Sequence, residues 1–468
     1  MNAIHVENPA KAFDRKRRGL LTPVTRRAKK SAAFGLCLAA GILAPSYRQG
    51  PSLGPGAGYA EPAGRVRPGI EVLVSDRLNL IRDKNVGLIT NPSGVDGRLN
   101  GTISILRRIP GLKLVALYAP EHGVRGDAQA GEYVPFYFED KHGLPVFSLY
   151  GPSQKPQPGM LKNIDEFMRS FDTTAEDKTV RPEMTRDIDV LIFDIQDVGT
   201  RVYTYAATMA YAMQACAEAG LEFIVLDRPN PITGRFLEGP VLEYPEFSSF
   251  IGLYPVPLRP GMTIGEMALL INDRFLDKKA KLTVVPMKGW KRGLWFEETG
   301  LPWVNPSPNM PTVDTAVVYP GQVMLEGTNV SEGRGTNHPF EFFGAPWIDG
   351  FELTARLNSL GLPGVTFREQ WFTPTFSKFQ GERCGGCQIH ITDRNVFRSV
   401  RTSLHIIAVL REMHPDRFAF HDDYFDKVCG TSSVREALLG GIAVEAIVDG
   451  FEKDLREFEA LRKPYLLY

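Results

Sequence analysis

Residues 189–227 decide the fold, and they read DVLIFDIQDVGTRVYTYAATMAYAMQACAEAGLEFIVLD. Continuous apolar runs at 189–195 and 222–227 flank an Ala-, Met- and Tyr-rich stretch at 203–220 that is typical of a helix. A strand without polar alternation is buried on both faces, and parallel strands need a crossover between them. The stretch therefore predicts a parallel βαβ unit in a sheet that helices cover on both faces.

The same alternation of apolar strands and helical patterns runs back towards the N-terminus. Together these segments predict a Rossmann-like α/β domain with a parallel sheet over residues 65–245. The further strands are expected at 85–90, 112–119 and 144–150, and the further helices at 102–109 and 160–171.

The remainder has a different pattern, which predicts a smaller α+β C-terminal domain over residues 246–468. A tract at 295–348 is rich in Gly, Pro and Asn and has little periodicity, so we expect a long loop there. A loop of this length in a compact protein commonly carries function, here substrate binding. Helices are expected at 261–275, with Thr263 as N-cap, and at 396–413, and strands at 282–287, 364–372 and 387–393.

The first 60 residues differ from the rest in charge. The whole chain has 54 Lys and Arg and 54 Asp and Glu, but this leader is mostly basic, so the remainder is mildly acidic. An acidic body has no electrostatic footprint for nucleic acid. Within the leader, RRAKK at 26–30 precedes SAAFGLCLAAGILA at 31–44, a run that suits a signal h-region better than a membrane span.

The leader therefore predicts export to the periplasm or the extracellular space. We expect a basic leader and linker over residues 1–60, with the signal segment at about 26–60. The alternative is an uncleaved membrane anchor, and only in that case is a membrane an expected partner.

The polar segments that follow the expected strands locate the site. In open parallel sheets, ligands bind beyond the carboxyl ends of the strands. The segments at 90–96, 119–132, 150–156, 194–205 and 227–231 are all polar and all contain Gly or Pro. We therefore expect a substrate to bind along this rim of the sheet.

These segments carry no pattern for a nucleotide or a metal. TNPSGVD at 90–96 has one glycine where a dinucleotide turn has G-x-G-x-x-G, and no Walker motif is present. His122 lies beside Glu121 and Asp127, but an H-E-x-x-H motif is absent. CGGC at 384–387 has no second CxxC, so it is either a local disulfide or two idle thiols. We expect no cofactor and no metal.

Acidic residues remain as the source of chemistry. Glu121, Asp127, Asp194 and Asp197 come from neighbouring strand ends. Hydrolysis of an acetal needs a carboxylic acid to protonate the leaving oxygen, and a second carboxylate to activate water or attack the anomeric carbon. His122 could tune the pKa of Glu121 for the first role. Alternatively, the PEHG segment caps a helix or binds backbone amides, and Asp194 and Asp197 only hold their own turn together.

The Gly/Pro/Asn-rich tract is expected to form the opposite wall of the site. Its segments at 306–312 and 326–341 are dense in amides, hydroxyls and carboxylates. Arg201 and Arg334 suit a ligand carboxylate through paired hydrogen bonds, or else salt bridges to neighbouring acids. Three tryptophans flank the tract and either stack on sugars or pack in the core: Trp295, Trp303 and Trp347.

Eight long motifs occur in order along the chain: VGLITNPSGVD, PEHGVRGDAQAGE, DVLIFDIQDVGTRVYTY, LDRPNPITG, VPLRPGMTIGEMA, TGLPWVNPSPNMPT, EGTNVSEGRGTNHPFEFFGAPW and TPTFSKFQGERCGGCQIHITD. This succession resembles the exo-β-N-acetylmuramidase family over about residues 68–468. The resemblance implies a glycoside hydrolase that releases N-acetylmuramic acid from the non-reducing ends of peptidoglycan fragments. It also implies a Rossmann-like domain and a smaller C-terminal domain, with the active site in the cleft between them.

Motif by motif, the resemblance makes Glu121 of PEHG the expected catalytic residue. Its partner is an acid of DIQDVG or of EGTNVSEGRG, and the family motif leaves open which one. The candidates for catalysis are Glu121, Asp194, Asp197 and Glu332. The candidates for substrate binding are His122, Arg125, Arg201, Tyr203, Asn309, Glu326, Thr328, Asn329 and Arg334.

Chemistry supports part of this set independently of the resemblance. Muramic acid carries a lactyl carboxylate, which Arg201 or Arg334 could bind, while amides and hydroxyls of the tract could bind its hydroxyls and acetamide. The expected partners are thus peptidoglycan-derived saccharides. Two other functions stay open, a two-lobed sugar- or muropeptide-binding protein without turnover and a metal-dependent peptidoglycan deacetylase or amidase.

Overall fold

The computed structural model describes residues 64–151, 154–169 and 186–468. These residues belong to one compact unit, Glu61–Tyr468. The predicted leader, and the end of the helix predicted at 160–171, lie outside the described residues. In the part of the chain that the structure describes, no helix has both the length and the apolar composition of a membrane span.

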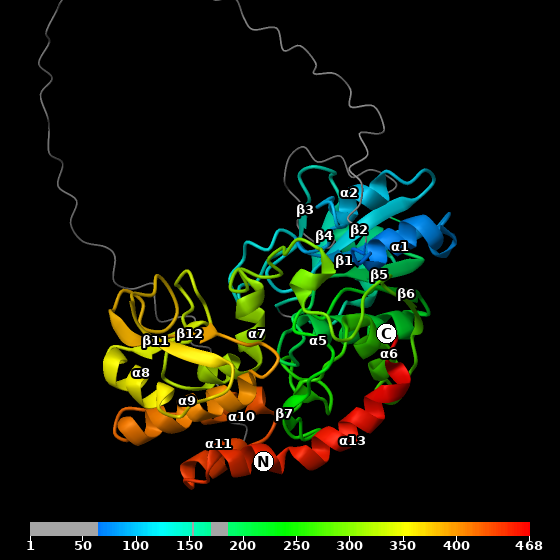
Figure 1. Cartoon of the computed structure of the whole chain (residues 1–468). Helices are drawn as coiled ribbons and strands as arrows, with labels where there is room; N and C mark the ends of the chain where they lie inside the picture. Colours follow the sequence, from blue (N-terminus) through cyan, green and yellow to red (C-terminus); the bar gives the residue numbers. More distant parts are fainter. Residues whose placement is uncertain (1–63, 152–153, 170–185) are drawn as a thin grey trace, which may run out of the picture. The chain divides into compact units, whose positions relative to one another are not determined.

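A seven-stranded sheet forms the larger layer, and its strand order is β3-β4-β2-β1-β5-β6-β9 (Figure 1). All neighbouring strands pair in parallel except β3 and β4. The prediction of a mostly parallel α/β sheet is therefore confirmed. The strands are β1 (Asn85–Thr90), β2 (Lys113–Ala119), β3 (Tyr137–Phe138), β4 (Pro145–Ser148), β5 (Val190–Asp194), β6 (Glu222–Leu226) and β9 (Lys281–Val285).

The sheet has its topological switch point at β1. From β1 the chain first builds outwards through β2 and β4, and then crosses to the other side of β1 to build β5, β6 and β9. In such sheets a crevice opens beyond the carboxyl ends of the strands at the point where the order reverses. The crevice is therefore expected beyond the ends of β1 and β5, which are neighbours in the sheet.

Both faces of the sheet are buried, as the continuous apolar strands require. In β5, Leu191 and Phe193 pack into one core with α5 and α6, and Val190 and Ile192 pack into a second core with α1 and α2. The helices of this layer are α1 (Gly69–Asp76), α2 (Thr102–Arg107), α3 (Pro158–Leu161), α4 (Ile164–Arg169), α5 (Tyr205–Ala219) and α6 (Ile264–Arg274).

Local sequence accounts for the ends of these helices. Thr263 Oγ1 accepts a hydrogen bond from the backbone amide of Glu266, and the Glu266 side chain accepts one from the Thr263 amide. The predicted N-cap of α6 is therefore confirmed as a capping box. Gly220 ends α5 in the left-handed conformation, with φ 72°, which glycine adopts without steric cost.

A smaller antiparallel sheet follows, with strand order β10-β12-β11. Its strands are β10 (Phe342–Ala345), β11 (Val365–Phe372) and β12 (Cys384–Ile391), and a two-stranded ribbon joins β7 (Glu238–Val241) and β8 (Pro257–Arg259). The helices of this part are α7 (Val313–Gln322), α8 (Gly350–Asn358), α9 (Ser399–Met413), α10 (Asp422–Cys429), α11 (Ser433–Leu439), α12 (Val444–Gly450) and α13 (Glu452–Arg462).

The division at residue 245 stays a prediction. The strand β9 (Lys281–Val285) comes from beyond that residue, yet it pairs with β6 at the edge of the large sheet. Material from the predicted second domain therefore contributes to the first layer.

The prediction of a long structureless loop at 295–348 was wrong. This tract contains α7 (Val313–Gln322), the 3-10 helices at Phe296–Thr299 and Val323–Gly327, and β10. Nearly every residue of α7 is buried, so the helix has no polar face and gives no periodic signal. A Cβ at Gly321 would lie 2.1 Å from the carbonyl oxygen of Ser399, so glycine permits the close contact between α7 and α9.

The two cysteines of CGGC are free thiols on β12. Of the two alternatives left by the sequence, the structure therefore has no disulfide between Cys384 and Cys387. Both side chains are buried, and Cys387 Sγ lies 3.1 Å from Thr354 Oγ1.

Candidate active site

A cavity of about 430 Å³ lies beyond the carboxyl ends of the large sheet. This size falls in the range of small-molecule sites. One wall follows β2, β4 and β5, and the other comes from residues 307–340 and from α10. Six of the predicted site residues line this cavity, hereafter the Glu121 pocket: Glu121, His122, Tyr203, Asn309, Glu326 and Arg334.

Glu121 lies two residues beyond the end of β2 and is 7% exposed. Its Oε1 accepts a hydrogen bond from the Gly131 amide at 3.1 Å, and its Oε2 accepts one from Thr204 Oγ1 at 2.8 Å. Neither donor carries a charge. The carboxyl group is thus held in place by neutral donors, and no cation among the described residues forms a salt bridge with it.

Tyr150 faces Glu121 from the end of β4. Burial, together with the negative charge of Glu121 and a hydrogen bond to it, raises the pKa of Tyr150 to about 12. The phenol therefore stays protonated at neutral pH and can donate to Glu121. This adds a third neutral donor around the carboxylate.

His122 has a left-handed backbone, with φ 72°. Such a conformation is uncommon for a residue with a side chain and is a hint of function where it occurs in a pocket. His122 Nδ1 donates to the Ala128 carbonyl at 2.9 Å, which leaves Nε2 as an acceptor in the neutral ring. Burial lowers the pKa of His122 and outweighs the attraction of Glu121, so the ring is neutral at pH 7.

Glu326 and Arg334 form the charged part of the opposite wall. Arg334 donates to Glu326 Oε1 from Nη2 at 2.6 Å and from Nε at 3.2 Å, and Tyr424 donates to Oε2 at 2.8 Å. Burial by itself lowers the pKa of Arg334, but Glu326 and Glu332 more than offset it and raise that pKa. Arg334 Nη1 makes no hydrogen bond to the residues that the structure describes.

Glu332 lies behind Arg334 and does not line the pocket. Its side chain is 2% exposed and forms ion pairs with Lys378 at 3.0 Å and with Arg334 at 3.5 Å. Lys378 also donates to the carbonyls of Leu325 and Val330 at 2.7 and 3.0 Å. The structure thus corrects the placement of Glu332, which supports the loop instead of facing a ligand.

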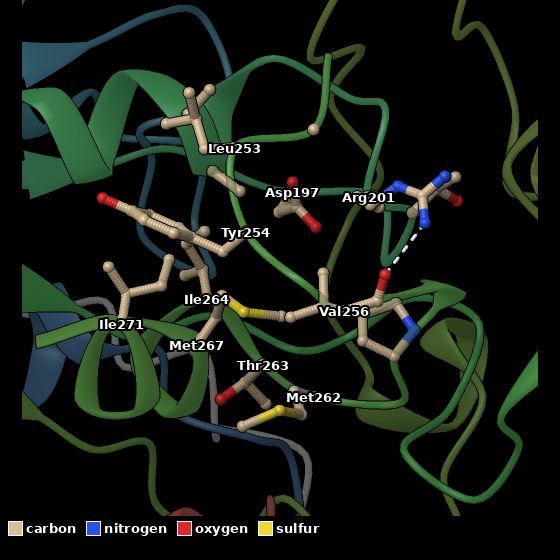
Figure 2. Close-up of a pocket in the computed structure, with 15 residues that line it drawn as sticks. Asp197, Arg201, Leu253, Tyr254, Val256, Met262, Thr263, Ile264, Met267 and Ile271 are labelled. Atoms are coloured by element: carbon tan, nitrogen blue, oxygen red, sulfur yellow. Dashed lines mark hydrogen bonds between the residues drawn. The ribbon is translucent and has the colours of Figure 1, made fainter. Parts of the chain in front are cut away.

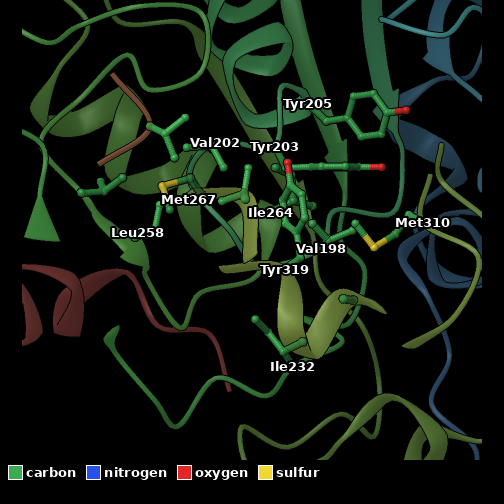
Figure 3. Packing of buried hydrophobic residues seen from close by; sticks show 14 of the residues in the cluster. Val198, Val202, Tyr203, Tyr205, Ile232, Leu258, Ile264, Met267, Met310 and Tyr319 are labelled. Carbon is green, nitrogen blue, oxygen red and sulfur yellow. The ribbon is translucent and has the colours of Figure 1, made fainter. Parts of the chain in front are cut away.

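Hydrogen bonds and stacked rings tie the two walls together. Asn91, directly after β1, donates to Tyr205 Oη at 2.9 Å and to the Pro306 carbonyl at 2.8 Å. Tyr203 and Tyr319 pack edge to face at 5.8 Å between ring centroids, and Figure 3 shows them beside Tyr205 and Met310. These contacts hold the two walls of the pocket together.

Asp194 does not line the pocket, although it ends β5, which lies on the other side of β1 from β2. It is fully buried and accepts hydrogen bonds from Arg228 Nε at 2.6 Å and from Thr102 Oγ1. Arg228 also donates to the Val95 carbonyl at 2.9 Å. A carboxylate in a buried ion pair cannot reach a substrate, so the structure places Asp194 in the framework of the rim.

Asp197 and Arg201 line a different and much smaller cavity of about 40 Å³ (Figure 2). Asp197 Oδ2 accepts a hydrogen bond from the Gly199 amide at 2.7 Å, while its buried Oδ1 has no partner among the described residues. Burial raises the pKa of Asp197 to about 7. The apolar side chains around this cavity, including Leu253, Met262 and Ile271, leave no room for a sugar.

The hydrogen bonds of Arg201 within the described ranges all go to backbone carbonyls. Its Nη1 donates to Pro240 and Val256 at 3.0 and 2.8 Å, and its Nη2 donates to Val428 and Cys429 at 2.8 and 2.7 Å. Burial lowers the pKa of Arg201 to about 10. Both alternatives from the sequence are corrected, because this guanidinium holds α10 against β7 and β8.

Two further binding candidates stabilise turns. Thr328 Oγ1 donates to the Leu325 carbonyl at 2.9 Å. Asn329 donates to the Arg417 carbonyl at 2.7 Å and accepts from the Ala419 amide at 2.9 Å. Since their polar groups are used in this way and neither lines the pocket, the structure does not bring Thr328 and Asn329 to the site.

Arg125 also lies outside the pocket. Its side chain is 51% exposed and pairs with Glu139 at 3.3 Å and Asp140 at 3.5 Å. The three tryptophans do not line the pocket either, and they pack against the core: Trp295, Trp303 and Trp347.

Several pocket residues were missed by the sequence reasoning. Tyr150 and Thr204 lie in the polar segments at 150–156 and 194–205, so their place after a strand was an available signal. Tyr319 lies in the unexpected helix α7, and Tyr424 lies far along the chain in α10, so nothing in their neighbourhood marks them. The further lining residues include Gln154, Phe250, Ser307, Met310 and Phe340.

No group of three or more His, Cys, Asp or Glu side chains within the described ranges is arranged to hold a metal ion. The pocket instead brings together two carboxyl groups, one held by neutral donors and one paired with an arginine. This is a donor set for proton transfer and for binding a polar, anionic ligand.

Comparisons with known proteins agree with this chemistry. Two family models match the chain, both described as exo-β-N-acetylmuramidase NamZ. The model of the N-terminal part matches residues 86–173 and 168–314, and the model of the C-terminal part matches residues 317–468. The chain is 51% identical over 405 residues to the peptidoglycan β-N-acetylmuramidase NamZ of Bacillus subtilis strain 168, covering 86% of this chain and 92% of that protein.

Two solved structures are also similar, both DUF1343 family proteins from Bacteroides fragilis. One is 40% identical with a TM-score of 0.76, and the match covers 87% of this chain and 100% of the Bacteroides chain. The other is 29% identical with a TM-score of 0.67, and covers 86% of this chain and 99% of its own.

Proposed function

The chain belongs to the exo-β-N-acetylmuramidase NamZ family, and from this premise we propose that the Glu121 pocket is its active site. The protein is a glycoside hydrolase of peptidoglycan turnover that removes N-acetylmuramic acid from the non-reducing ends of peptidoglycan fragments. The observation that carries the assignment of the site is that Glu121 and Glu326 line one cavity of about 430 Å³ together with Arg334.

Glu121 is the general acid or base in this proposal. Glycosidases need one carboxyl group that protonates the leaving oxygen, and that group must gain and lose a proton. The Gly131 amide, Thr204 Oγ1 and the Tyr150 phenol hold this carboxyl group at the pocket. By contrast, Asp194 is locked by a buried cation and is unsuited to this step.

Glu326 is the second carboxylate. Of the partner acids considered from the sequence, only Glu326 lines the same pocket as Glu121. Its ion pair with Arg334 at 2.6 Å holds it in the pocket, where the second carboxylate of a glycosidase attacks the anomeric carbon or activates water. The separation of the two carboxyl groups in the complex determines whether the configuration at the anomeric carbon is retained or inverted.

Arg334 and Asn309 provide the recognition of N-acetylmuramic acid. Arg334 uses Nε and Nη2 for Glu326, and its Nη1 can donate to the lactyl carboxylate. Asn309 Nδ2 is buried, lines the pocket and has no hydrogen-bond partner among the described residues. A buried donor without a partner is costly in the free protein, so an acetamide or hydroxyl oxygen of the substrate would satisfy it.

An assay with a chromogenic β-N-acetylmuramide beside its β-N-acetylglucosaminide counterpart tests the site. We expect hydrolysis of the muramide, and we expect Arg334→Ala to lower kcat/KM for it by about tenfold to a hundredfold more than for the glucosaminide, because a hydrogen bond to a charged group contributes about 1.5–3 kcal/mol. Arg125→Ala is the matched control, since Arg125 lies outside the pocket. Equal losses on both substrates would exclude Arg334 as the carboxylate ligand.

We further propose that the protein is exported. The support is the basic run at 26–30 followed by the apolar run at 31–44, the pattern of a secretory signal. Expression of the full chain in a bacterial host, followed by cell fractionation and mass determination of the exported form, tests this. Recovery of the intact chain in the cytoplasm alone would contradict the proposal.

A further inference from the structure

A second hollow is lined by the residues that directly follow Arg334. It has a volume of about 540 Å³, and Gly335, Thr336 and Asn337 form part of its wall. Arg334 and Gly335 are consecutive, so their Cα atoms lie about 3.8 Å apart. One short loop therefore borders both the Glu121 pocket and this hollow, hereafter the Trp371 hollow.

The lining of the Trp371 hollow combines aromatic rings with amides and hydroxyls. The remaining wall comes from the end of β11 and the segment after it, with Phe342 of β10. Trp371 is half-buried, whereas Phe342 and Phe372 are buried. The ring centroids of Phe342 and Phe372 lie 5.9 Å apart. The polar groups include Asn337, Gln370, Thr373 and Thr375.

Both kinds of side chain match the chemistry of a saccharide. A pyranose ring has an apolar face of C–H groups, which packs on the face of an aromatic side chain, and an edge of hydroxyl and acetamide groups, which needs donors and acceptors. Asn337 is exposed, and its side chain makes no hydrogen bond to any residue that the structure describes. Its amide is thus free to bind a polar group of a ligand.

The hollow is held in shape before any ligand binds. The Gly335 carbonyl accepts hydrogen bonds from the amide and Oγ1 of Thr375 at 2.9 and 3.0 Å, which ties the loop to the segment after β11. The Trp371 and Phe351 rings pack together with 4.8 Å between their centroids. The Arg383 guanidinium carbon lies 5.9 Å from the Trp371 ring centroid. A fixed surface loses little conformational entropy on binding, which favours affinity.

We propose that the Trp371 hollow binds saccharide units on the leaving side of the cleaved bond. This inference rests on the proposed function. An exo-acting enzyme takes one terminal sugar into its pocket, so the rest of the fragment must extend along the surface beyond it. The loop at 334–337 contributes to the lining of both cavities, and the composition of the Trp371 hollow suits that remainder.

Kinetics with two substrates test the proposal. The first is the chromogenic β-N-acetylmuramide, which has no sugar on its leaving side, and the second is a tetrasaccharide of alternating N-acetylmuramic acid and N-acetylglucosamine. We expect Trp371→Ala to raise KM for the tetrasaccharide about threefold to tenfold, with kcat within about twofold, since an aromatic contact of this kind contributes about 0.5–1.5 kcal/mol. Both constants for the chromogenic substrate should stay within about twofold.

Two further variants keep the test decisive. Trp371→Phe retains an aromatic face and should recover most of the tetrasaccharide affinity. Asn337→Ala removes an exposed side chain without hydrogen bonds to described residues, so it should fold normally and raise the tetrasaccharide KM about threefold, in line with a loss of about 0.5–1 kcal/mol.

The outcomes separate this inference from the proposed function. If the wild-type protein cleaves neither compound, the proposed function is contradicted. If it cleaves both, and neither Trp371→Ala nor Asn337→Ala changes the tetrasaccharide KM, or both substrates are affected equally, the leaving-side site is contradicted while the proposed function stands.

Discussion

Glu121 and Asp194 come from the two strands that flank β1, yet their surroundings are opposite. Glu121 follows β2 and receives its hydrogen bonds from an amide and a hydroxyl at the edge of a cavity. Asp194 ends β5 and is fully buried against Arg228 and Thr102. The same edge of one sheet thus presents one acid to a cavity and encloses the other.

This difference shows what a position at a strand end does and does not imply. The carboxyl ends of parallel strands bring polar residues to one rim, but the neighbouring side chains decide which of them can exchange a proton. A buried cation at 2.6 Å occupies the Asp194 carboxylate, whereas Glu121 lines a cavity and is held by neutral donors. The two acids should therefore respond to substitution in opposite ways.

The largest expected effect is on turnover in Glu121→Gln. We expect kcat to fall about 10³-fold with little change in ligand affinity, because the amide keeps the size of the side chain and an acceptor but cannot transfer the proton. Steady-state kinetics and calorimetric binding of N-acetylmuramic acid measure this. Glu132→Gln, at an exposed acid of the same loop, is the control, and a loss of less than tenfold in Glu121→Gln would refute the assignment.

The next effect is on stability in Asp194→Asn. Removing one partner leaves the buried Arg228 charge unpaired, which costs about 3–5 kcal/mol of the free energy of unfolding. Denaturant unfolding measures this, and Glu412→Gln is the control, since Glu412 forms an exposed pair with Arg356 that contributes at most about 1 kcal/mol. An Asp194→Asn protein with wild-type stability and a 10³-fold loss of kcat would reverse the comparison with Glu121.

The smallest effect is a pH dependence of stability from Asp197. Burial raises the pKa of Asp197 from 3.8 to about 7, so between these values the folded state holds a proton that the unfolded state has released. The free energy of unfolding should then fall as pH rises from about 4 to 7, by about 2–4 kcal/mol. Asp197→Asn should lack this loss.

Thermal unfolding of the wild type and of Asp197→Asn across pH 4–8 checks this prediction. Asp140→Asn, at an acid whose side chain is 82% exposed, is the control and should follow the wild type. Parallel curves for the wild type and Asp197→Asn would mean that the Asp197 carboxylate is hydrated and carries an ordinary charge.

Much of the large sheet could be predicted because its signal is local. Each of its central strands is a continuous apolar run, such as 190–194 in β5, and each strand is bounded by Gly, Pro or polar residues. The N-cap at Thr263 is equally local, since the capping box joins only Thr263 and Glu266, three positions apart in the sequence. The helix α7 could not be predicted, because burial on all sides removes the periodicity that marks a helix.

The site could be predicted only in part for a related reason. Glu121, Asn309 and Arg334 were predicted from composition and motif, and they line one pocket. Arg201 has the same chemistry as Arg334, but its partners are carbonyls at residues 240, 256, 428 and 429. No local pattern states which distant carbonyls an arginine will meet.

The sequence by itself determined the parallel sheet, the rim on which the polar residues lie and the family, because apolar runs, turn residues and ordered motifs are properties of adjacent positions. Only the tertiary structure decided which acids are accessible, which arginine keeps a free donor, and that Tyr319 and Tyr424 join the pocket. These depend on contacts between residues up to hundreds of positions apart, as in the bond from Arg201 to Val428, and on the charge and burial that such contacts create.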